Sequence, residues 1–193
     1  MKKIASLVLA VCMVFASCNA FAQDLKQKKA LFIVAAKDFQ EQELARPYAE
    51  LSRNGVAISL ASTVKGEAVG TNGAKARIDM LLVDAKVDDF DAIVFIGGPG
   101  AAQYLDDPVA HKVARDAIKK KKLLAAICMG PLILAKAGVL KGKKATVFPT
   151  LAEDLKKEGV KYSAKPVERD GRIITADGPD SAVAFGNEIL KAL

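Results

Sequence analysis

The sequence predicts a single-domain α/β protein with a mostly parallel sheet covered by helices on both faces. Short apolar runs, typical of strands buried on both faces, alternate along the chain with segments of helical spacing. This alternation implies a three-layer sandwich. Two of the runs end at Gly97-Gly98 and at Cys128. Because ligands bind beyond the carboxyl ends of strands in such sheets, we expect the functional site there.

The first half of the chain carries signals for several strands and one long helix. Three segments have strand character, the last as a hairpin or short edge strands: residues 30–36, 56–61 and 64–85. Residues 41–54 repeat apolar side chains at helical spacing, and Gly55 is a typical C-terminal stop. Pro47 lies inside this helix and should bend or restart it.

The second half of the chain continues the alternation. Further strands are expected at residues 91–96, 123–127, 144–148, 162–168 and 172–175. Further helices are expected at residues 108–118, 131–137, 151–158 and from about residue 181 to the C-terminus. Asp170-Gly171 supplies the turn between the last two strands, and Asp180 or Ser181 is expected to cap the last helix.

The N-terminus has the pattern of a secretory signal peptide. Two lysines precede an apolar stretch at residues 4–16, which is too short to span a bilayer comfortably. The small residues of Ala20-Phe21-Ala22 form a cleavage signature. We therefore predict a signal peptide over residues 1–22, cleaved after Ala22, and a periplasmic or secreted protein. A lipoprotein signal with Cys18 as the lipidated first residue, and an uncleaved anchor, are the alternatives.

Composition and charge argue against several classes of partner. One domain is expected over residues 29–193, and no segment after the signal is long and apolar enough to cross a membrane. The sequence has 29 Lys and Arg against 22 Asp and Glu, a formal charge of +7, but the lysines are scattered. The run at residues 119–122 contains no aromatic residue, which is typical of a solvated helix end. We therefore expect no nucleic-acid partner.

No cofactor or metal is expected. The segment Gly97-Gly98-Pro99-Gly100 follows a strand, but it lacks the spacing of a dinucleotide loop and the Lys-Ser/Thr ending of a phosphate loop. After removal of residues 1–22, one histidine, His111, and one cysteine, Cys128, remain. They are far apart in the sequence and are too few for a metal cluster or an internal disulfide.

Cys128 has the sequence context of a nucleophile elbow. A buried strand leads into it directly, and a helix begins almost at once, with Pro131 suited to its first turn. The amides and positive end of this helix favour a thiolate at Cys128. If the two strand ends are neighbours, the amides of Gly98 and Met129 can together hold an oxyanion. The alternative is a small, inert, buried cysteine.

The chain resembles the DJ-1/ThiJ/PfpI superfamily over about residues 29–193. The resemblance lies in AICMGP at residues 126–131 with AGVLKGK at 137–143, GGPG at 97–100, EQELARPY at 41–48, and DGRIIT at 170–175 with GP at 178–179. The first of these looks like the active-cysteine signature of the PfpI branch. The resemblance implies a flavodoxin-like sheet, similar to that of class I glutamine amidotransferases, with a nucleophile elbow. It also implies a homodimer or higher homo-oligomer.

The resemblance assigns roles to particular residues. Cys128 falls on the elbow cysteine of the superfamily, and Glu43 falls on its acidic residue. In the superfamily that carboxyl lies against the thiol and carries a proton, so that the two groups titrate as a coupled pair. Gly97 and Gly98 fall on the glycines of the oxyanion side. Without the resemblance, Glu43 reads as an exposed helix charge.

Two departures from the pattern concern histidine. Peptidase-like and glyoxalase-like members have a histidine directly after the cysteine, where this chain has Met129. In the DJ-1 branch a histidine can precede the proline after the next strand, where this chain has Phe148. His111, the single histidine, is expected on the surface. A cysteine protease needs a base for the thiol and an acid for the leaving amine, so these departures argue against a peptidase.

The function that the resemblance implies, given the residues present, is glyoxalase-like or deglycase-like handling of reactive carbonyls or glycated substrates by Cys128 and Glu43. The first alternative is a redox sensor or stress-protective protein in which Cys128 is oxidised. The second is a chaperone or binding module in which Cys128 is structural. Arg77 is a weaker candidate, for the lining of the site or of an interface.

Overall fold

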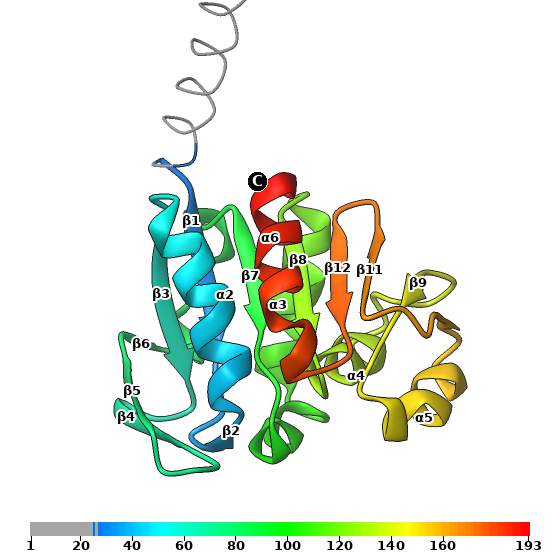
Figure 1. The fold of residues 1–193 in the computed structure, drawn as a ribbon, viewed down its shortest axis with the longest axis horizontal. Coiled ribbons are helices and arrows are strands. Elements are labelled where there is room, and N and C mark those ends of the chain that lie inside the picture. Colours follow the sequence, from blue (N-terminus) through cyan, green and yellow to red (C-terminus); the bar gives the residue numbers. More distant parts are fainter. Residues whose placement is uncertain (1–24, 26) are drawn as a thin grey trace, which may run out of the picture.

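The computed structural model describes residue 25 and residues 27–193, and it confirms the α/β fold class. The predicted signal peptide, residues 1–22, lies outside the described residues. A central seven-stranded sheet runs through the molecule in the order β11-β12-β8-β7-β1-β3-β6 (Figure 1). Neighbouring strands are parallel throughout, except that β11 is antiparallel to β12.

The strands of the central sheet are short and mostly buried. Their bounds are β1 Lys29–Ile33, β3 Ala57–Ser62, β6 Met80–Leu81, β7 Ala92–Phe95, β8 Leu123–Ile127, β11 Val167–Asp170 and β12 Ile173–Ala176. Every residue of β7, β8 and β12 is buried, as expected of central strands covered on both faces. Their continuous apolar runs therefore form the core between the helical layers.

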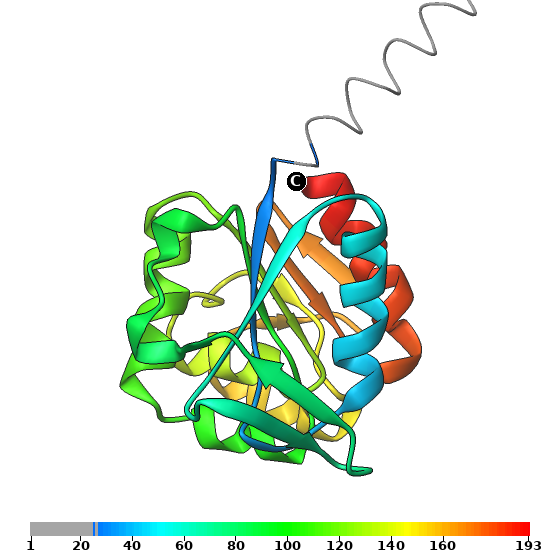
Figure 2. The same ribbon diagram turned by 90° about the vertical axis from the view of Figure 1, so that its left-hand side faces the viewer.

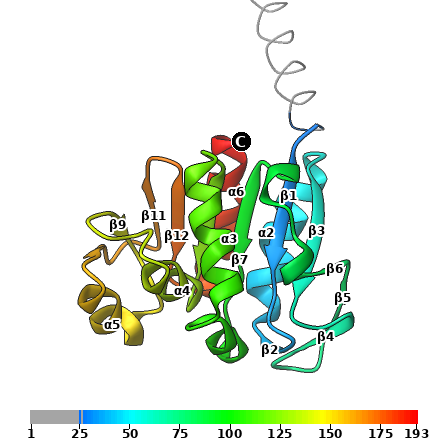
Figure 3. The same ribbon diagram turned by 180° about the vertical axis from the view of Figure 1, so that it is seen from behind.

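Helices cover both faces of the sheet, which gives the three predicted layers. Helices α2 (Glu41–Arg53) and α6 (Ala182–Ala192) lie side by side on one face (Figure 1). Helices α3 (Pro108–Lys119) and α4 (Gly130–Lys136) cover the other face (Figure 3), and α5 (Ala152–Lys157) lies at one edge. Figure 2 shows the layers edge-on, with the sheet between the two helical layers. Short 3-10 turns occupy Leu82–Asp84, Val87–Asp89, Pro99–Tyr104, Pro149–Leu151 and Pro179–Ser181.

Two smaller sheets lie outside the central one. Strands β4 (Gly66–Gly70) and β5 (Lys75–Ile78) form the predicted hairpin, and β2 (Lys37–Phe39), which the sequence did not predict, pairs in parallel with β4. Strands β9 (Lys144–Ala145) and β10 (Lys161–Tyr162) form a separate parallel pair. The strands predicted at 144–148 and 162–168 are therefore wrong in extent, because the first is two residues long and the second is split between β10 and β11.

Two predicted helix details also need correction. Helix α2 continues through Pro47, so the expected restart is wrong, while the expected bend stays a prediction. Ser181 does stand at the N-cap of α6, but its side chain makes no capping hydrogen bond. The Ser181 hydroxyl instead donates to Oδ1 of Asp177 at 2.5 Å.

Among the residues that the structure describes, no helix combines the length and the apolar character needed to cross a bilayer.

Candidate active site

The predicted site residues meet where β7 and β8 end. The two strands are parallel neighbours with Phe95 opposite Ala126, so the residues that follow them leave the sheet together. Gly97 and Gly98 follow β7, and Cys128 follows β8. This edge of the sheet is the one at which the sequence predicted the site.

Cys128 occupies a sharp and tightly held turn between β8 and α4. Its φ angle is 61°, in the left-handed region that costs a non-glycine residue about 1–2 kcal/mol. The Cys128 amide donates to the carbonyl of Ala176 at 2.9 Å, and its own carbonyl accepts from the amide of Phe148 at 3.0 Å. The backbone of the elbow is thus fixed from both sides, and its half-buried side chain lines a cavity.

Helix α2 brings Glu43 to the sulfur. Gln40 caps the helix, because its side-chain oxygen accepts from the amides of Gln42 at 2.6 Å and Glu43 at 3.1 Å. The Gln40 amide donates to the carbonyl of Gly97 at 3.1 Å, which ties the start of α2 to the end of β7. Glu43 lies in the first turn of the helix and has no exposed surface.

Burial raises the pKa of Glu43 to about 7, from its ordinary value of 4.5. Neither carboxyl oxygen makes a hydrogen bond of normal geometry to the residues that the structure describes. The Cys128 thiol and the Gly97 amide are nevertheless close enough to offset part of the rise in pKa. A buried carboxyl with so few partners exchanges its proton near neutral pH, which suits acid–base chemistry.

The predicted thiolate is wrong for the resting site. Burial, and next the negative charge of Glu43, raise the pKa of Cys128 to about 12. The amides of Gly98 and Met129 lower the pKa of the thiol, but by less. The thiol therefore keeps its proton at neutral pH, and a base must remove this proton when the sulfur reacts.

The backbone around the sulfur offers two donors. The amides of Gly98 and Met129 both point at Sγ of Cys128, as the oxyanion hypothesis requires. The amide of Gly97 faces the carboxyl of Glu43 instead. Gly98 has a φ angle of 102°, and a Cβ there would lie 2.6 Å from the carbonyl oxygen of Asp38. Binding of an oxyanion by these groups stays a prediction.

A cavity of about 400 Å³ opens at Cys128. Its wall is mostly apolar and comes from the ends of β7 and β8, the start of α2 and the loops after β9 and β12. The lining residues are Gln40, Glu43, Gly98, Pro99, Cys128, Met129, Phe148, Thr150, Leu151 and Pro179. Larger hollows elsewhere on the surface contain neither Glu43 nor Cys128.

The model of the DJ-1/PfpI family matches residues 28–192. The chain belongs to the DJ-1/PfpI family. A solved structure with this fold, the ThiJ/PfpI domain protein from Brachyspira murdochii, superposes with a TM-score of 0.84 at 27% identity, over 85% of this chain and 95% of that one. The flavodoxin-like arrangement expected from the resemblance is therefore confirmed.

Relatives in the family carry names of several kinds. An uncharacterized protein of Methanocaldococcus jannaschii is 40% identical over 100% of this chain and 98% of its own length. Deglycase PfpI of Pyrococcus furiosus is 33% identical over 86% of this chain and 99% of its own. The glutathione-independent glyoxalase DJR-1.2 of Caenorhabditis elegans is 30% identical over 86% of this chain and 89% of its own.

The other candidate residues lie away from this family site. His111 in α3 is half-buried, and its Nε2 lies 2.8 Å from the carbonyl oxygen of Leu105. Arg77 is exposed in β5 and does not line the cavity at Cys128. Across residues 27–193, no cluster of three His, Cys, Asp or Glu side chains has the arrangement of a metal site.

Sequence reasoning missed part of the cavity wall. Gln40, Thr150, Leu151 and Pro179 were not singled out, although Pro179 stands in a segment that carries the family resemblance. Gln40 is detectable only as the polar residue just before the helix that holds Glu43. Thr150 and Leu151 lie in a loop whose path depends on tertiary packing, so the sequence gives no signal for them.

Proposed function

We propose that this protein converts small reactive carbonyl compounds, with Cys128 as the nucleophile and Glu43 as the acid–base group. One observation carries the proposal. A fully buried carboxyl whose pKa is raised to about 7 touches a half-buried thiol that faces a cavity. Groups tuned to titrate near neutral pH in a cavity are typical of catalytic sites.

The two groups share a proton in the reactive form. Above a pH of about 7 the pair of Glu43 and Cys128 holds one proton, because burial and the carboxylate charge keep the thiol protonated. When the sulfur attacks an aldehyde carbon, the S–H proton passes to the Glu43 carboxylate. The carbonyl oxygen becomes an alkoxide, which the amides of Gly98 and Met129 are placed to stabilise.

An α-oxoaldehyde then allows an internal proton shift. The alkoxide takes the proton from Glu43 and becomes a hemithioacetal. The freed carboxylate removes the hydrogen on the former aldehyde carbon and passes it to the ketone oxygen, which gives an enediol. The carboxylate then takes the proton of the other hydroxyl group and delivers it to the neighbouring carbon, so that this hydroxyl oxygen becomes the thioester carbonyl. The product is a 2-hydroxy thioester on Cys128, which water hydrolyses to a 2-hydroxy acid and the free thiol. No oxidant, reductant or metal enters this balance.

The names of the relatives agree with this chemistry at the level of the family. Proteins 30% and 33% identical to this chain are named a glyoxalase and a deglycase. Peptidase chemistry has less support, because Met129 and Phe148 stand in the cavity wall where other members carry histidine. A buried carboxyl can serve a carbonyl addition without a histidine partner.

The test is turnover of methylglyoxal to lactate by the purified protein. Cys128→Ala should abolish turnover, and Glu43→Gln should lower kcat at least about 100-fold, the usual contribution of an acid–base group. Glu50→Gln is the matched control, because Glu50 lies on the same helix and pairs with Arg53 at the surface. Turnover that survives in Cys128→Ala would overturn the proposal.

The pH dependence gives a second readout of the same proposal. The wild-type kcat/KM should rise with pH through about 7, as Glu43 loses its proton and becomes able to accept that of the thiol. Glu43→Gln should lack this limb in whatever residual activity it keeps. A wild-type profile flat between pH 5 and about 9 would contradict the assignment of Glu43 as the base.

A redox function is the second candidate, because the two amides at Sγ and a protonated Glu43 are also suited to hold an oxidised sulfur. Two molecules of peroxide would convert the thiol to a sulfinic acid and leave two molecules of water, an increase of about 32 Da. The raised pKa of Cys128 slows this reaction, since the thiolate is the form that peroxide attacks. If dilute peroxide leaves the mass of Cys128 unchanged, the redox function is excluded.

We also propose that residues 1–22 direct export and that the mature protein is a homo-oligomer. The first proposal rests on the pattern of the N-terminus, and the second on membership of the family. Mass spectrometry of the protein recovered from cells should find Gln23 at the N-terminus, while an acylated Cys18 would replace cleavage with lipoprotein processing. Light scattering of the purified protein should give at least twice the mass of the chain, and a monomer mass would overturn the second proposal.

A further inference from the structure

The cavity at Cys128 has a mostly apolar wall. Met129, Phe148, Leu151, Pro99 and Pro179 are among its lining residues. Its volume of about 400 Å³ lies in the range of cavities that bind drug-sized ligands. Glyoxal, or methylglyoxal with its single methyl group, would leave most of this space filled by water against apolar surface.

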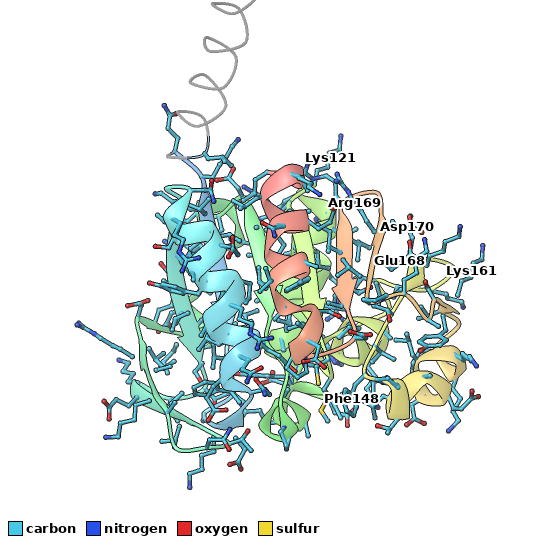
Figure 4. The ribbon with its side chains drawn as sticks, in the orientation of Figure 1. Lys121, Phe148, Lys161, Glu168, Arg169 and Asp170 are labelled. Atoms are coloured by element: carbon cyan, nitrogen blue, oxygen red, sulfur yellow. The ribbon has the colours of Figure 1, made fainter. Side chains whose placement is uncertain are left out.

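Phe148 is the clearest unexplained feature of the wall. Its side chain is 39% exposed, which makes it one of the most exposed large apolar groups in the part of the chain that the structure describes. Its amide donates to the carbonyl of Cys128 at 3.0 Å, so the backbone of residue 148 is held beside the elbow. The ring also packs against Gly178, where an added Cβ would lie 3.5 Å from Cδ2. Figure 4 shows Phe148 at the edge of the molecule where β7 and β8 end.

The cavity wall has few polar groups, and one of them already makes hydrogen bonds within the protein. The side-chain oxygen of Gln40 already accepts two amides of α2. Thr150 is the one other neutral polar side chain in the wall, and Glu43 is the one ionisable group there besides Cys128. A sugar-like aldehyde would bring several hydroxyl groups against this wall, and burying them without partners costs free energy.

We infer that the site selects α-oxoaldehydes that carry an extended alkyl or aryl substituent, with Phe148 as the main residue that binds this substituent. The reaction rests on the proposed function, but the selection is a property of the cavity. In the bound state the aldehyde carbon lies at Sγ of Cys128, and the substituent covers the rings and side chains of Phe148, Met129 and Leu151. Burial of that apolar surface supplies the binding free energy.

Turnover of a homologous series of alkylglyoxals tests the selection. From methylglyoxal to pentylglyoxal the reacting carbon is unchanged, so differences in kcat/KM report on the substituent. Each added methylene should raise kcat/KM about fourfold, the value expected for burial of one CH₂ group. A kcat/KM that is flat or falls along the series would overturn the inference.

Variants of Phe148 test whether this side chain causes the rise in kcat/KM with substituent length. Phe148→Ser should reduce the rise per methylene to less than about twofold, because the variant removes the apolar surface that each methylene covers. Phe148→Leu should keep most of the rise. Both variants should fold, since the ring is 39% exposed and the elbow contact uses only the backbone of residue 148. An unchanged slope in Phe148→Ser would remove Phe148 from the proposal.

Alkylation of Cys128 tests the cavity without requiring turnover. N-alkyl iodoacetamides with chains of two to eight carbons react at the same carbon, where sulfur displaces iodide. The second-order rate at Cys128, followed by peptide mass mapping of the full chain, should rise with chain length about tenfold or more across the series. If no α-oxoaldehyde is turned over but this trend is present, the proposed function fails and the apolar cavity stands. If the alkylation rate at Cys128 does not rise with chain length, and wild type and Phe148→Ser behave alike, the cavity proposal itself is overturned.

Discussion

The two strand ends that form the site differ in the residues that follow them, glycines at one end and a cysteine at the other. Gly97 and Gly98 follow strand β7; they have no side chains, and their backbone fits closely among its neighbours. Cys128 follows strand β8, and it keeps a side chain in a left-handed backbone conformation that normally favours glycine. The first end provides space and amides, and the second provides the sulfur.

This difference shows how the pair of Cys128 and Glu43 is kept together. A Cβ on Gly97 would overlap a carboxyl oxygen of Glu43, and it would lie 2.7 Å from Cβ of Cys128. The missing side chain therefore allows an acid and a thiol from distant parts of the sequence to touch. The strained turn at Cys128 then fixes the direction of the sulfur, because both its amide and its carbonyl are hydrogen-bonded.

Filling the space at the glycine end should have the largest effect. Gly97→Ala places a methyl group between Glu43 and Cys128, so one of them must move. We expect kcat/KM for methylglyoxal to fall at least about 100-fold, because a displacement of about 1 Å at a reacting group costs that much. The free energy of unfolding should fall by about 1–3 kcal/mol through overpacking, measured by denaturant titration.

Gly73→Ala is the control for that substitution. Gly73 lies between β4 and β5 with a φ angle of +87°, and an added Cβ there meets no atom within 4 Å. The control should lose about 1 kcal/mol through backbone strain and keep full activity. Equal activity losses in the two variants would show that the space at Gly97 has no special role.

The buried acid gives the next largest effect, on stability as a function of pH. The native pKa of Glu43 is about 7 and its ordinary value is 4.5, so the native state holds the proton more tightly than the unfolded chain. The resulting stability is complete below pH 4.5 and is lost as pH rises through about 7. The loss should be about 3 kcal/mol, from 1.36 kcal/mol for each pKa unit.

Urea titrations of wild type and Glu43→Gln at several pH values measure this loss. The difference between the two proteins isolates Glu43, because the other titrating groups are common to both. Glu43→Gln should show a smaller fall in the free energy of unfolding between pH 4.5 and about 7. Parallel curves would mean that Glu43 has an ordinary pKa, and the acid–base role would lose its basis.

The strands beside the site were predictable, and the small outer strands were not. Strand β8 has the predicted bounds, because a short continuous apolar run that follows a lysine cluster and leads into a turn is typical of a central buried strand. Strand β2 contains Lys37 and Asp38, and it pairs with β4, which is distant in the sequence. Strands β9 and β10 have two residues each, so their pairing depends on tertiary packing. No local pattern in the sequence marks such strands.

For the site, the sequence identified the residues but not their electrostatics. The context of Cys128 predicted a sharp turn, and its φ angle of 61° agrees. The position of Glu43 beside it came from the resemblance to a family, since an isolated glutamate in an amphipathic helix is most often exposed. The prediction of a resting thiolate was wrong, because burial of the thiol, and next the negative charge of Glu43, raise the pKa of Cys128, and only the assembled fold determines both.

The smallest expected effect isolates the strain at the sulfur end. Cys128→Ala and Cys128→Gly both remove the thiol, but only glycine relieves the left-handed backbone at φ 61°. Cys128→Gly should therefore be the more stable of the two by about 1 kcal/mol in the free energy of unfolding, although glycine is ordinarily the destabilising choice. The same pair of substitutions at Ala126, inside β8, should show the opposite order, because glycine weakens a strand interior. If alanine were also the more stable residue at position 128, the elbow would be relaxed, and the sulfur would be held in place by its surroundings alone.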